Sequence, residues 1–412
     1  MEQKSGSERK ERLVRSSKNR ITLFQLYRNY FAMTSHSNKI NVLFVILQTE
    51  MGGSERLVHT LVQSIDRSVF NPFVAWFFGD TPFKEFKDLH VPLFHVPKKK
   101  RIDFSAMQQL SDIVRENNIH MVNAHHFMSL VYAFYGCKIA NRRRLIYTEH
   151  SAWEIDAMTE RWKMMGSFLL KRVDASIGVT PAVSLQIQSA FKTNEAKTFV
   201  IENGVDISRF SHAHDKAKML ASLGLREDEK VIGIVANFKK IKNHMYLLKA
   251  FNGLIKEYEN VRLLLVGQGF KNDPEDSETE IRSFIEKNGL NDKVTILGYR
   301  SDVPDLLSIM DIFCLTSFSE GLPISLIEAM AAGRPLVGTD VNGIKEVIIQ
   351  NRNGVLVNVN DVDEMKRALL ALLRDESLRN KMGNESRHLV ESHYSLNGFV
   401  RQYENLFKSL IQ

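Results

Sequence analysis

The chain has 412 residues, of which 44% are hydrophobic and 25% are charged. This length exceeds one ordinary hydrophobic core and predicts two or three globular domains. The longest apolar runs, such as VLFVIL, are too short to span a bilayer, and the N-terminus shows no signal-peptide core. The two cysteines, Cys137 and Cys314, cannot form a cysteine-only metal site. We expect both to be reduced core residues in a reducing compartment.

The formal charge of +7 is concentrated at the N-terminus. Residues 1–40 hold nine Lys and Arg against three Glu, so this segment carries +6 and the remainder is close to neutral. We expect 1–40 to be a basic, partly disordered extension. Residues 21–31 predict a short amphipathic helix, which either lies on an anionic membrane surface or packs on the protein's own domain. Nothing in the sequence indicates a nucleic-acid-binding module, so nucleic acid is not an expected partner.

Strand and helix patterns alternate from residue 41 onward. Helical patterns such as 104–117 and 181–191 lie between short apolar runs. This alternation is typical of a mostly parallel sheet with helices on both faces. The strands expected in the first half are 41–47, 72–78, 91–96, 120–124, 144–148, 175–179 and 198–201.

Turn residues at 202–210 end this first half, and the pattern restarts near residue 230. The strands expected in the second half are 230–237, 261–267, 293–298, 311–316, 334–339 and 354–357. Two doubly wound units would bind their ligand in a cleft at the carboxyl ends of the strands. We therefore expect an N-terminal domain at 41–207, a C-terminal domain at 208–395 and a terminal helix at 396–412 that braces both.

The stretch 317–339 carries two carboxylates around the start of a helix. Glu320 lies in a loop before Pro323, and Glu328 follows eight positions later on the helix. Carboxylates accept hydrogen bonds from sugar hydroxyls, and a helix N-terminus attracts anions. The pattern fits a sugar-phosphate site, although a capping loop with one surface Glu explains it as well.

Two loops between a strand and a helix could bind phosphate. Residues 238–244 hold three lysines, of which Lys242 is nearest the helix start and our candidate for a diphosphate contact; a solvated loop is the alternative. Residues 51–56, MGGSER, lack both the Walker ending and the full dinucleotide pattern, so a tight turn explains them equally well.

Histidines follow two strands of the first half. His125 and His126 follow 120–124, and His150 follows 144–148, so both sets are expected on the ligand side of the sheet. Their spacing does not match a metal pair and offers no third ligand. Residues 361–363, Asp-Val-Asp, precede a plain helix and are expected to cap it. No nucleophile triad is recognisable, so hydrolysis is not favoured.

Residues 320–348, EGLPISLIEAMAAGRPLVGTDVNGIKEVI, resemble the donor-binding motif of retaining GT-B glycosyltransferases of family four. Its signature is Glu, seven residues, Glu. The resemblance extends over about 41–412 through MGGSER, ENGVDISRF, VANFKKIKNH, LLLVGQG and ILGYRSDVPDLLSIMDIFCLTSFSEG. It implies an α/β GT-B fold, with two Rossmann-like doubly wound domains facing a central cleft.

The resemblance also implies roles for single residues. Glu328 should hold the ribose hydroxyls of a nucleotide-sugar. Glu320 should accept a hydroxyl of the donor sugar, helped by the N–H groups of Gly321 and Leu322. Lys242 should contact the diphosphate.

Further residues complete the implied donor site. Gly53 should let the diphosphate and sugar approach, and His150 should contact the sugar. Tyr299 and Arg300 should hold the base through their backbone. We thus expect Glu320, His150 and Lys242 to take part in catalysis, with no metal and no cofactor.

The sequence departs from the family pattern at two places in the second half of the chain. Asn237 stands five residues before Lys242, where the family commonly has Arg. Because Asn is neutral, either one phosphate contact is weaker or Lys239 or Lys240 substitutes. Residues 271–280 form an acidic insertion that we expect to be mobile and exposed.

These observations predict a retaining, metal-independent glycosyltransferase. It would move a sugar from a nucleotide-sugar, by family habit a UDP-sugar, to a saccharide or lipid-linked acceptor in cell-envelope polysaccharide, lipopolysaccharide or glycolipid biosynthesis. The alternatives are a GT-B nucleotide-sugar epimerase and a non-catalytic nucleotide-sugar-binding protein. We expect a cytoplasmic location, peripheral on the inner face of the plasma membrane through residues 1–40.

Overall fold

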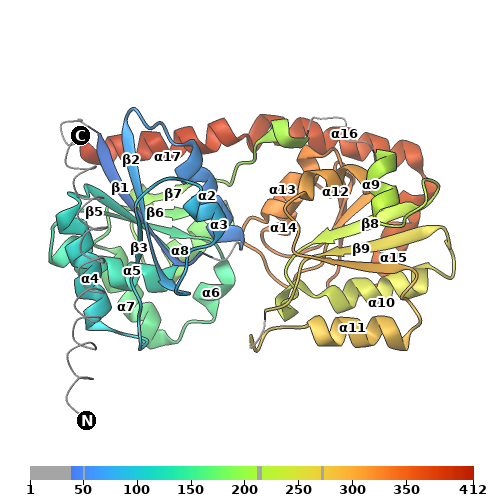
Figure 1. The fold of residues 1–412 in the computed structure, drawn as a ribbon, viewed down its shortest axis with the longest axis horizontal. Coiled ribbons are helices and arrows are strands. Elements are labelled where there is room, and N and C mark those ends of the chain that lie inside the picture. Colours follow the sequence, from blue (N-terminus) through green and yellow to red (C-terminus); the bar gives the residue numbers. More distant parts are fainter. Residues whose placement is uncertain (1–38, 50–51, 211–215, 271–272) are drawn as a thin grey trace, which may run out of the picture. The chain divides into compact units, whose positions relative to one another are not determined.

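The computed structural model describes residues 39–49, 52–210, 216–270 and 273–412. The predicted amphipathic helix at 21–31, and the basic extension apart from its last two residues, lie outside the described residues. Ile40 and the turn Asp66–Asn71 form a small unit of their own, in which the Ile40 N–H donates to the Val69 carbonyl at 2.9 Å. Within the rest of the described chain, strands and helices alternate as expected (Figure 1).

The first sheet has seven strands in the order β3-β2-β1-β4-β5-β6-β7. Its central pair is parallel, with Val42 of β1 opposite Met121 of β4. Both strands are buried on both faces in their central parts, which is typical of a parallel sheet covered by helices. The strands are β1 (Ile40–Gln48), β2 (Phe70–Phe78), β3 (Leu93–His95), β4 (Met121–His125), β5 (Arg144–Glu149), β6 (Ala175–Gly178) and β7 (Thr198–Val200).

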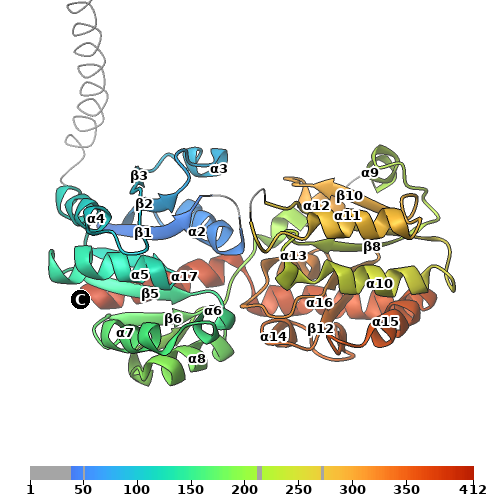
Figure 2. The ribbon, with the colours of Figure 1, turned by 90° about the horizontal axis from the view of Figure 1, so that it is seen from below.

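Helices connect these strands and cover the first sheet. Figure 1 shows α4, α5 and α7 on the lower side of the sheet and α17 on the upper side, and Figure 2 shows the lower side directly. These helices begin at local signals in the sequence: the Asp103 carboxylate accepts from the N–H groups of Ser105 and Ala106 at the start of α4. The helical segments are α2 (Gly53–Ser64), α3 (Lys84–Lys87), α4 (Phe104–Glu116), α5 (Phe127–Ala133), the π-helix η1 (Phe134–Ile139), α6 (Ala152–Asp156), α7 (Glu160–Leu170), α8 (Pro181–Phe191) and η2 (Glu195–Lys197).

The second sheet has six strands in the order β10-β9-β8-β11-β12-β13. Its neighbouring strands pair in parallel, and the central strands β8 and β11 pair through Ile232 and Ile312. The strands are β8 (Lys230–Val235), β9 (Val261–Val266), β10 (Val294–Gly298), β11 (Ile312–Leu315), β12 (Leu336–Thr339) and β13 (Gly354–Val357). Two doubly wound parallel sheets confirm the predicted fold class.

The helical segments from residue 207 onward connect and cover the second sheet, except for the last. They are η3 (Ile207–Phe210), α9 (Lys216–Ser222), η4 (Lys240–Lys242), α10 (His244–Leu254), α11 (Glu278–Lys287), α12 (Val303–Ile309), α13 (Ile324–Ala331), α14 (Ile344–Val347), α15 (Val362–Arg374), α16 (Glu376–His393) and α17 (Leu396–Ile411). Helix α16 packs on α13, whereas α17 packs on the first sheet, where the rings of Phe407 and Phe44 lie 6.1 Å apart.

Both sheets reverse their strand order at one position. In the first sheet the chain winds outward in both directions from β1 and β4, and in the second sheet from β8 and β11. Ligands of doubly wound sheets bind beyond the carboxyl ends of the strands at such a point. The loops after β1, β4, β8 and β11 are therefore the places to look for chemistry.

The two cysteines are buried and free, as expected. Among the described residues, the structure contains no helix with the length and hydropathy needed to cross a bilayer.

Candidate active site

Two loops of the second sheet are fastened together at its switch point. The Phe318 N–H, after β11, donates to the Ile241 carbonyl at 2.8 Å, after β8. The Thr316 hydroxyl donates to the Lys242 carbonyl at 3.0 Å. These bonds fix the lysine loop against the loop that carries Glu320.

Lys242 and Glu320 meet in this fastened region. The Lys242 ammonium lies 2.6 Å from Glu320 Oε1, and the Ser317 hydroxyl donates to the same oxygen at 2.5 Å. Glu320 is 8% exposed, and a buried carboxylate is stabilised only when it is paired and hydrogen-bonded. The two residues that the sequence picked from different loops therefore lie side by side.

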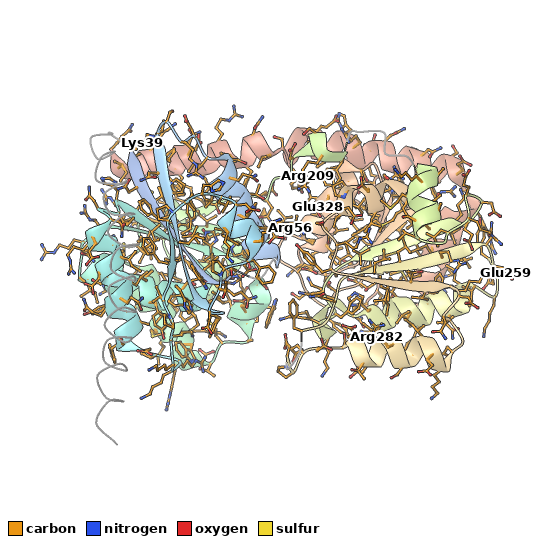
Figure 3. All side chains as sticks on the ribbon, viewed as in Figure 1. Lys39, Arg56, Arg209, Glu259, Arg282 and Glu328 are labelled. Carbon is orange, nitrogen blue, oxygen red and sulfur yellow. The ribbon has the colours of Figure 1, made fainter. Side chains whose placement is uncertain are left out.

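Glu328 faces a different cation. It is buried on α13, and its two carboxylate oxygens lie 3.1 and 3.4 Å from Arg56 Nη1, at the start of α2 (Figure 3). Sequence reasoning did not single out Arg56. The available signal was its place in the MGGSER loop, but nothing in that loop indicates a partner 272 positions away.

The segment between the two carboxylates is closely packed. A Cβ on Gly321 would lie 1.6 Å from the His150 carbonyl oxygen, so only glycine fits there. The Leu322 carbonyl accepts from the Asn203 amide at 2.8 Å, and Pro323 is the N-cap of α13. The approach of Gly321 to His150 brings two predicted site residues together.

Asn237 lies just after β8 with its side-chain oxygen buried, and this oxygen has no hydrogen-bond partner among the described residues. The neighbouring lysines are already engaged: Lys239 lies 2.9 Å from Asp273, and Lys240 donates to the Pro274 carbonyl at 3.2 Å. Lys242 is thus the lysine of this loop whose ammonium reaches Glu320.

The acidic insertion is attached to the lysine loop in its described part. The Lys240 N–H donates to the Glu275 carbonyl, and the Ser277 N–H donates to the Phe238 carbonyl, both at 2.7 Å. We expected a mobile surface insertion, but these bonds hold residues 275–277 against the phosphate-loop candidate. The Asp273 carboxylate of the insertion pairs with Lys239, and a sequence pattern could not show this ion pair.

The remaining predicted donor residues are more exposed. The Tyr299 hydroxyl donates to Glu85 at 3.2 Å, and Arg300 Nε pairs with Asp302 at 2.7 Å, so neither side chain is committed to the other site residues. The base contact through their backbone stays a prediction. A Cβ on Gly53 would meet no described atom within 4 Å, which leaves open space at the start of α2.

The first sheet places two histidines in contact. His125 Nδ1 lies 2.9 Å from His150 Nε2, and the rings are stacked with centroids 5.1 Å apart. Burial, and then the charge on His126, lowers the pKa of His125 to about 3; the same causes hold the pKa of His150 well below its usual range. Both rings are therefore neutral at pH 7 and exchange a hydrogen bond.

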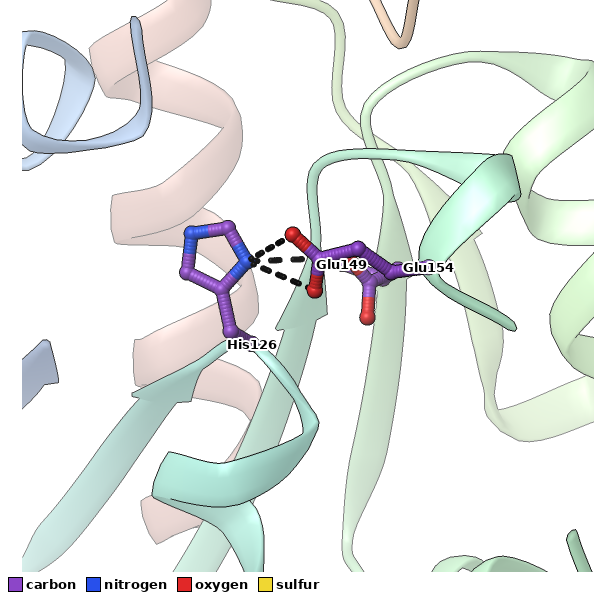
Figure 4. Close-up of side chains that lie close together, drawn as sticks. All are labelled: His126, Glu149 and Glu154. Atoms are coloured by element: carbon purple, nitrogen blue, oxygen red, sulfur yellow. Dashed lines mark hydrogen bonds and ion pairs between the residues drawn. The ribbon is translucent and has the colours of Figure 1, made fainter. Parts of the chain in front are cut away.

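His126 has the opposite electrostatics, and Figure 4 shows it beside Glu149 and Glu154. Its Nδ1 lies 3.3 Å from Glu154 and 3.9 Å from Glu149. Burial alone would lower the pKa of His126, but Glu154, Glu149 and Glu55 outweigh burial and raise it to about 10. The ring is thus an imidazolium between carboxylates at neutral pH.

Sequence reasoning found His126 but missed its carboxylates. The fold supplies them from the end of β5 and from α6, and the three ligand-type atoms all lie within 4.8 Å of one another. Burial, followed by Glu154, raises the pKa of Glu149. The positive His126 ring and the Glu154 carboxylate thus form a buried pair of opposite charges. The cluster thus brings one imidazole and two carboxyl groups together at the carboxyl end of the first sheet.

Comparison with known families identifies the class. Residues 51–209 match the family described as Glycosyltransferase Family 4, and residues 215–389 match the family described as Glycosyl transferases group 1. Together these matches cover the second sheet and all of the first sheet except β1. The chain belongs to the GT-B glycosyltransferases of family 4.

Individual relatives agree with this assignment. The chain is 26% identical over 331 residues to N-acetyl-α-D-glucosaminyl L-malate synthase of Bacillus anthracis, covering 79% of this chain and 84% of the relative. It is 23% identical over 400 residues to UDP-Gal:α-D-GlcNAc-diphosphoundecaprenol α-1,3-galactosyltransferase of Escherichia coli, covering 92% and 99%.

Solved structures share the fold. Anabaena HepE in complex with UDP-glucose superposes with a TM-score of 0.80 at 21% identity, over 90% of this chain and 100% of that chain. WaaG, a glycosyltransferase involved in lipopolysaccharide biosynthesis, gives a TM-score of 0.70 at 17% identity, over 89% and 99%. These likenesses confirm the GT-B architecture.

Proposed function

We propose that this chain transfers a sugar, with retention at the anomeric carbon, from a UDP-sugar to a hydroxyl of a lipid-linked or saccharide acceptor in cell-envelope glycan synthesis. The observation that carries the proposal is the meeting of Lys242 and Glu320 at the switch point of the second sheet, 2.6 Å apart. A cation for a diphosphate and a carboxylate for a sugar hydroxyl are the two contacts that a nucleotide-sugar requires side by side.

The chemistry follows from where charge develops. As the anomeric carbon separates from the diphosphate, negative charge grows on the leaving oxygen, and Lys242 would stabilise that charge. Glu320 would accept a hydrogen bond from a sugar hydroxyl. The acceptor oxygen forms the new bond to the anomeric carbon, the diphosphate takes the electron pair of the broken bond, and its leaving oxygen accepts the proton of the acceptor hydroxyl.

The other donor contacts are part of the same proposal. Glu328 would exchange Arg56 for the two ribose hydroxyls, and the backbone at Tyr299 and Arg300 would hold the base. Gly53, Asn237 and the N–H groups of Gly321 and Leu322 would line the diphosphate and sugar. His150 would contact the sugar as a neutral imidazole, which suits a hydroxyl partner. We propose that no metal or other cofactor is needed.

The names of the relatives support the acceptor class. The E. coli relative acts on a diphosphoundecaprenol-linked sugar, and a third relative, from Staphylococcus aureus, is a poly(ribitol-phosphate) α-N-acetylglucosaminyltransferase that is 26% identical over 239 residues. Anabaena HepE supports the nucleotide, because it was crystallised with UDP and with UDP-glucose. We further propose a cytoplasmic location at the inner face of the plasma membrane.

The test begins with a thermal-shift screen over nucleotide-sugars, since a ligand of the native state raises its stability. UDP release is then measured with the donor that binds, in the presence and absence of lipid-linked acceptors and of EDTA. Lys242→Ala and Glu320→Gln should each lower kcat by about 100-fold or more. Lys240→Ala in the same loop is the matched control and should retain activity.

Three results would contradict the proposal. Normal turnover in both variants would exclude the site. A nucleotide-sugar that changes configuration without any acceptor would indicate an epimerase, and binding without turnover would indicate a non-catalytic protein. Product NMR decides retention, because the anomeric coupling distinguishes the two outcomes, and loss of activity in EDTA would contradict metal independence.

A further inference from the structure

His125 is a buried polar side chain on β4 whose hydrogen bonding is incomplete. It is fully buried, and its Nε2 has no hydrogen-bond partner among the described residues. The centroid of the Phe44 ring lies 6.2 Å from that of His125, so part of its surroundings is apolar. A buried polar atom without a partner lowers stability, and a phenylalanine at this position would avoid that loss. A histidine here therefore indicates a task for the other ring nitrogen.

The other ring nitrogen contacts a residue of the candidate active site. His125 Nδ1 lies 2.9 Å from His150 Nε2. His125 ends β4, and His150 comes directly after β5, which pairs with β4 in parallel with His125 opposite Thr148. The register of these two strands thus brings both rings to the carboxyl edge of the sheet.

Further contacts fix the position of His150. Its backbone N–H donates to Glu149 Oε1 at 2.8 Å, and its carbonyl lies against Gly321. Its ring centroid is 4.9 Å from that of His126. These contacts do not decide which ring nitrogen of His150 carries the proton. In a neutral imidazole, the hydrogen bond made by one nitrogen sets the state of the other, so the bond to His125 decides it.

Two arrangements of the protons are possible. Because the pKa values of His125 and His150 are both lowered, each ring is neutral at pH 7 and has one N–H and one bare nitrogen. If His150 Nε2 donated, the proton of His125 would lie on its Nε2, which would be a buried N–H without a partner. If His125 Nδ1 donates, the unpaired buried atom is a bare nitrogen. Buried N–H groups without a partner are rarer than unpaired acceptors, which favours the second arrangement.

We propose that His125 is a positioning residue for His150: its Nδ1–H donates to His150 Nε2, so that His150 presents an Nδ1–H to the donor sugar. The sugar oxygen that contacts His150 would then accept a hydrogen bond, whereas the hydroxyl at Glu320 would donate one. The proposal deepens the proposed function and rests on it for the role of His150. Together the two residues would recognise an oxygen lone pair at one position of the sugar and a hydroxyl hydrogen at another.

The decisive experiment is NMR of the ring nitrogens in the full chain with isotope-labelled histidine. Long-range proton–nitrogen spectra distinguish a protonated ring nitrogen from a bare one and so identify the tautomer. The signals of His150 are assigned by their absence in His150→Asn. We expect wild-type His150 to carry its proton on Nδ1 at pH 7, and a proton on Nε2 would overturn the proposal. This measurement needs no substrate.

Variants of His125 test whether the bond acts on sugar transfer. UDP release is measured with UDP-glucose, UDP-galactose or UDP-N-acetylglucosamine, whichever gives the largest thermal shift. His125→Phe removes the donor and should lower kcat by roughly tenfold or more, with a mixture of tautomers at His150. His125→Asn offers an amide N–H near the position of Nδ1, so it should recover most of kcat and the Nδ1–H tautomer. An unchanged kcat and an unchanged His150 spectrum in His125→Phe would contradict the role.

The matched control is His120→Phe, at the other end of the same strand. His120 Nδ1 accepts from the Asn41 N–H at 2.8 Å, so this variant also loses one hydrogen bond, but away from the ligand edge of the sheet. Its kcat and His150 spectrum should match the wild type; an equal loss of kcat would indicate a general structural effect and count against His125. Thermal unfolding shows that each variant folds.

The two proposals fail separately. If His150 carries its proton on Nδ1 but no nucleotide-sugar is turned over, the proposed function fails and the assigned proton position stands. If sugar transfer is normal and the proton lies on Nε2, this inference alone fails.

Discussion

His244 is a buried imidazole whose two ring nitrogens have no hydrogen-bond partner among the described residues. It opens α10 and packs edge-on against Phe238, with ring centroids 4.9 Å apart. Burial, followed by the charge on Lys242, lowers its pKa to about 3. The folded protein therefore keeps His244 neutral over a pH range in which an unfolded chain would protonate it.

This difference predicts acid sensitivity. Below pH 6.5 the unfolded imidazole binds a proton that the folded one refuses until about pH 3, so stability falls as pH falls through this window. One such group costs about 1.4 kcal/mol per pH unit. Urea unfolding should show that the free energy of unfolding decreases as the pH falls from 7 to 4. In His244→Phe this slope should be smaller by the equivalent of one bound proton. His388→Phe, at an exposed histidine, is the control, and an unchanged slope in His244→Phe would contradict the assignment.

The donor-site residues show what sequence can and cannot supply at this scale. Glu320, Glu328 and Lys242 were identifiable because their loops have a characteristic order along the chain. Arg56 was not, because its partner Glu328 comes from a distant segment and only folding brings them together. Similarly, the carboxylates around His126 come from β5 and α6, and their effect on its pKa depends on burial that one sequence does not reveal.

At the scale of elements, the acidic residues before helix α15 were expected to cap it. The Asp361 carboxylate accepts from the Glu364 N–H at 2.8 Å, which confirms the predicted cap. Asp361→Ala should destabilise the fold by about 1 kcal/mol, because a helix N–H loses its partner. Asp363→Ala, two positions on, should change stability little. Urea unfolding of both variants measures this, and equal effects would argue against the cap.

The turn before α14 supports the loop that carries Glu320. Gly343 has φ +83°, and a Cβ there would lie 2.2 Å from the Gly321 carbonyl oxygen. Gly343→Ala should cost about 1–3 kcal/mol and displace the Glu320 loop, lowering sugar transfer together with stability. Gly289→Ala also has positive φ but meets no atom within 4 Å, so it should lose stability and keep kcat. Equal kcat values in the two variants would contradict this role.

The helices and strands were the most predictable part of this fold. Central strands such as β1 and β11 are buried on both faces, so they appear in the sequence as continuous apolar runs. The insertion near residue 275 shows the limit, because its polar composition indicated an exposed loop while its backbone pairs with the lysine loop. Backbone hydrogen bonds of loops leave no periodic pattern in a sequence.

At the scale of the whole molecule, α17 stabilises a sheet built from the other end of the chain. Phe407 is fully buried, 6.1 Å from Phe44 of β1 and 5.7 Å from Tyr403. Phe407→Ala should destabilise the fold by about 3–5 kcal/mol, because it leaves a cavity against the central strand. Ile411→Ala on the same helix, where the side chain is 41% exposed, is the control. A small loss in Phe407→Ala, measured by urea unfolding, would contradict this packing.

The contact between Phe44 and Phe407 also has a consequence for biosynthesis. Ribosomes add about 5–20 residues per second, so β1 would emerge roughly 20–70 seconds before the helix that covers it. During that interval the apolar side of β1 lacks its final cover, although the strands beside it are already made. Nascent chains of this protein should therefore depend on chaperones until translation ends, and a premature stop before residue 396 should direct the product to proteolysis.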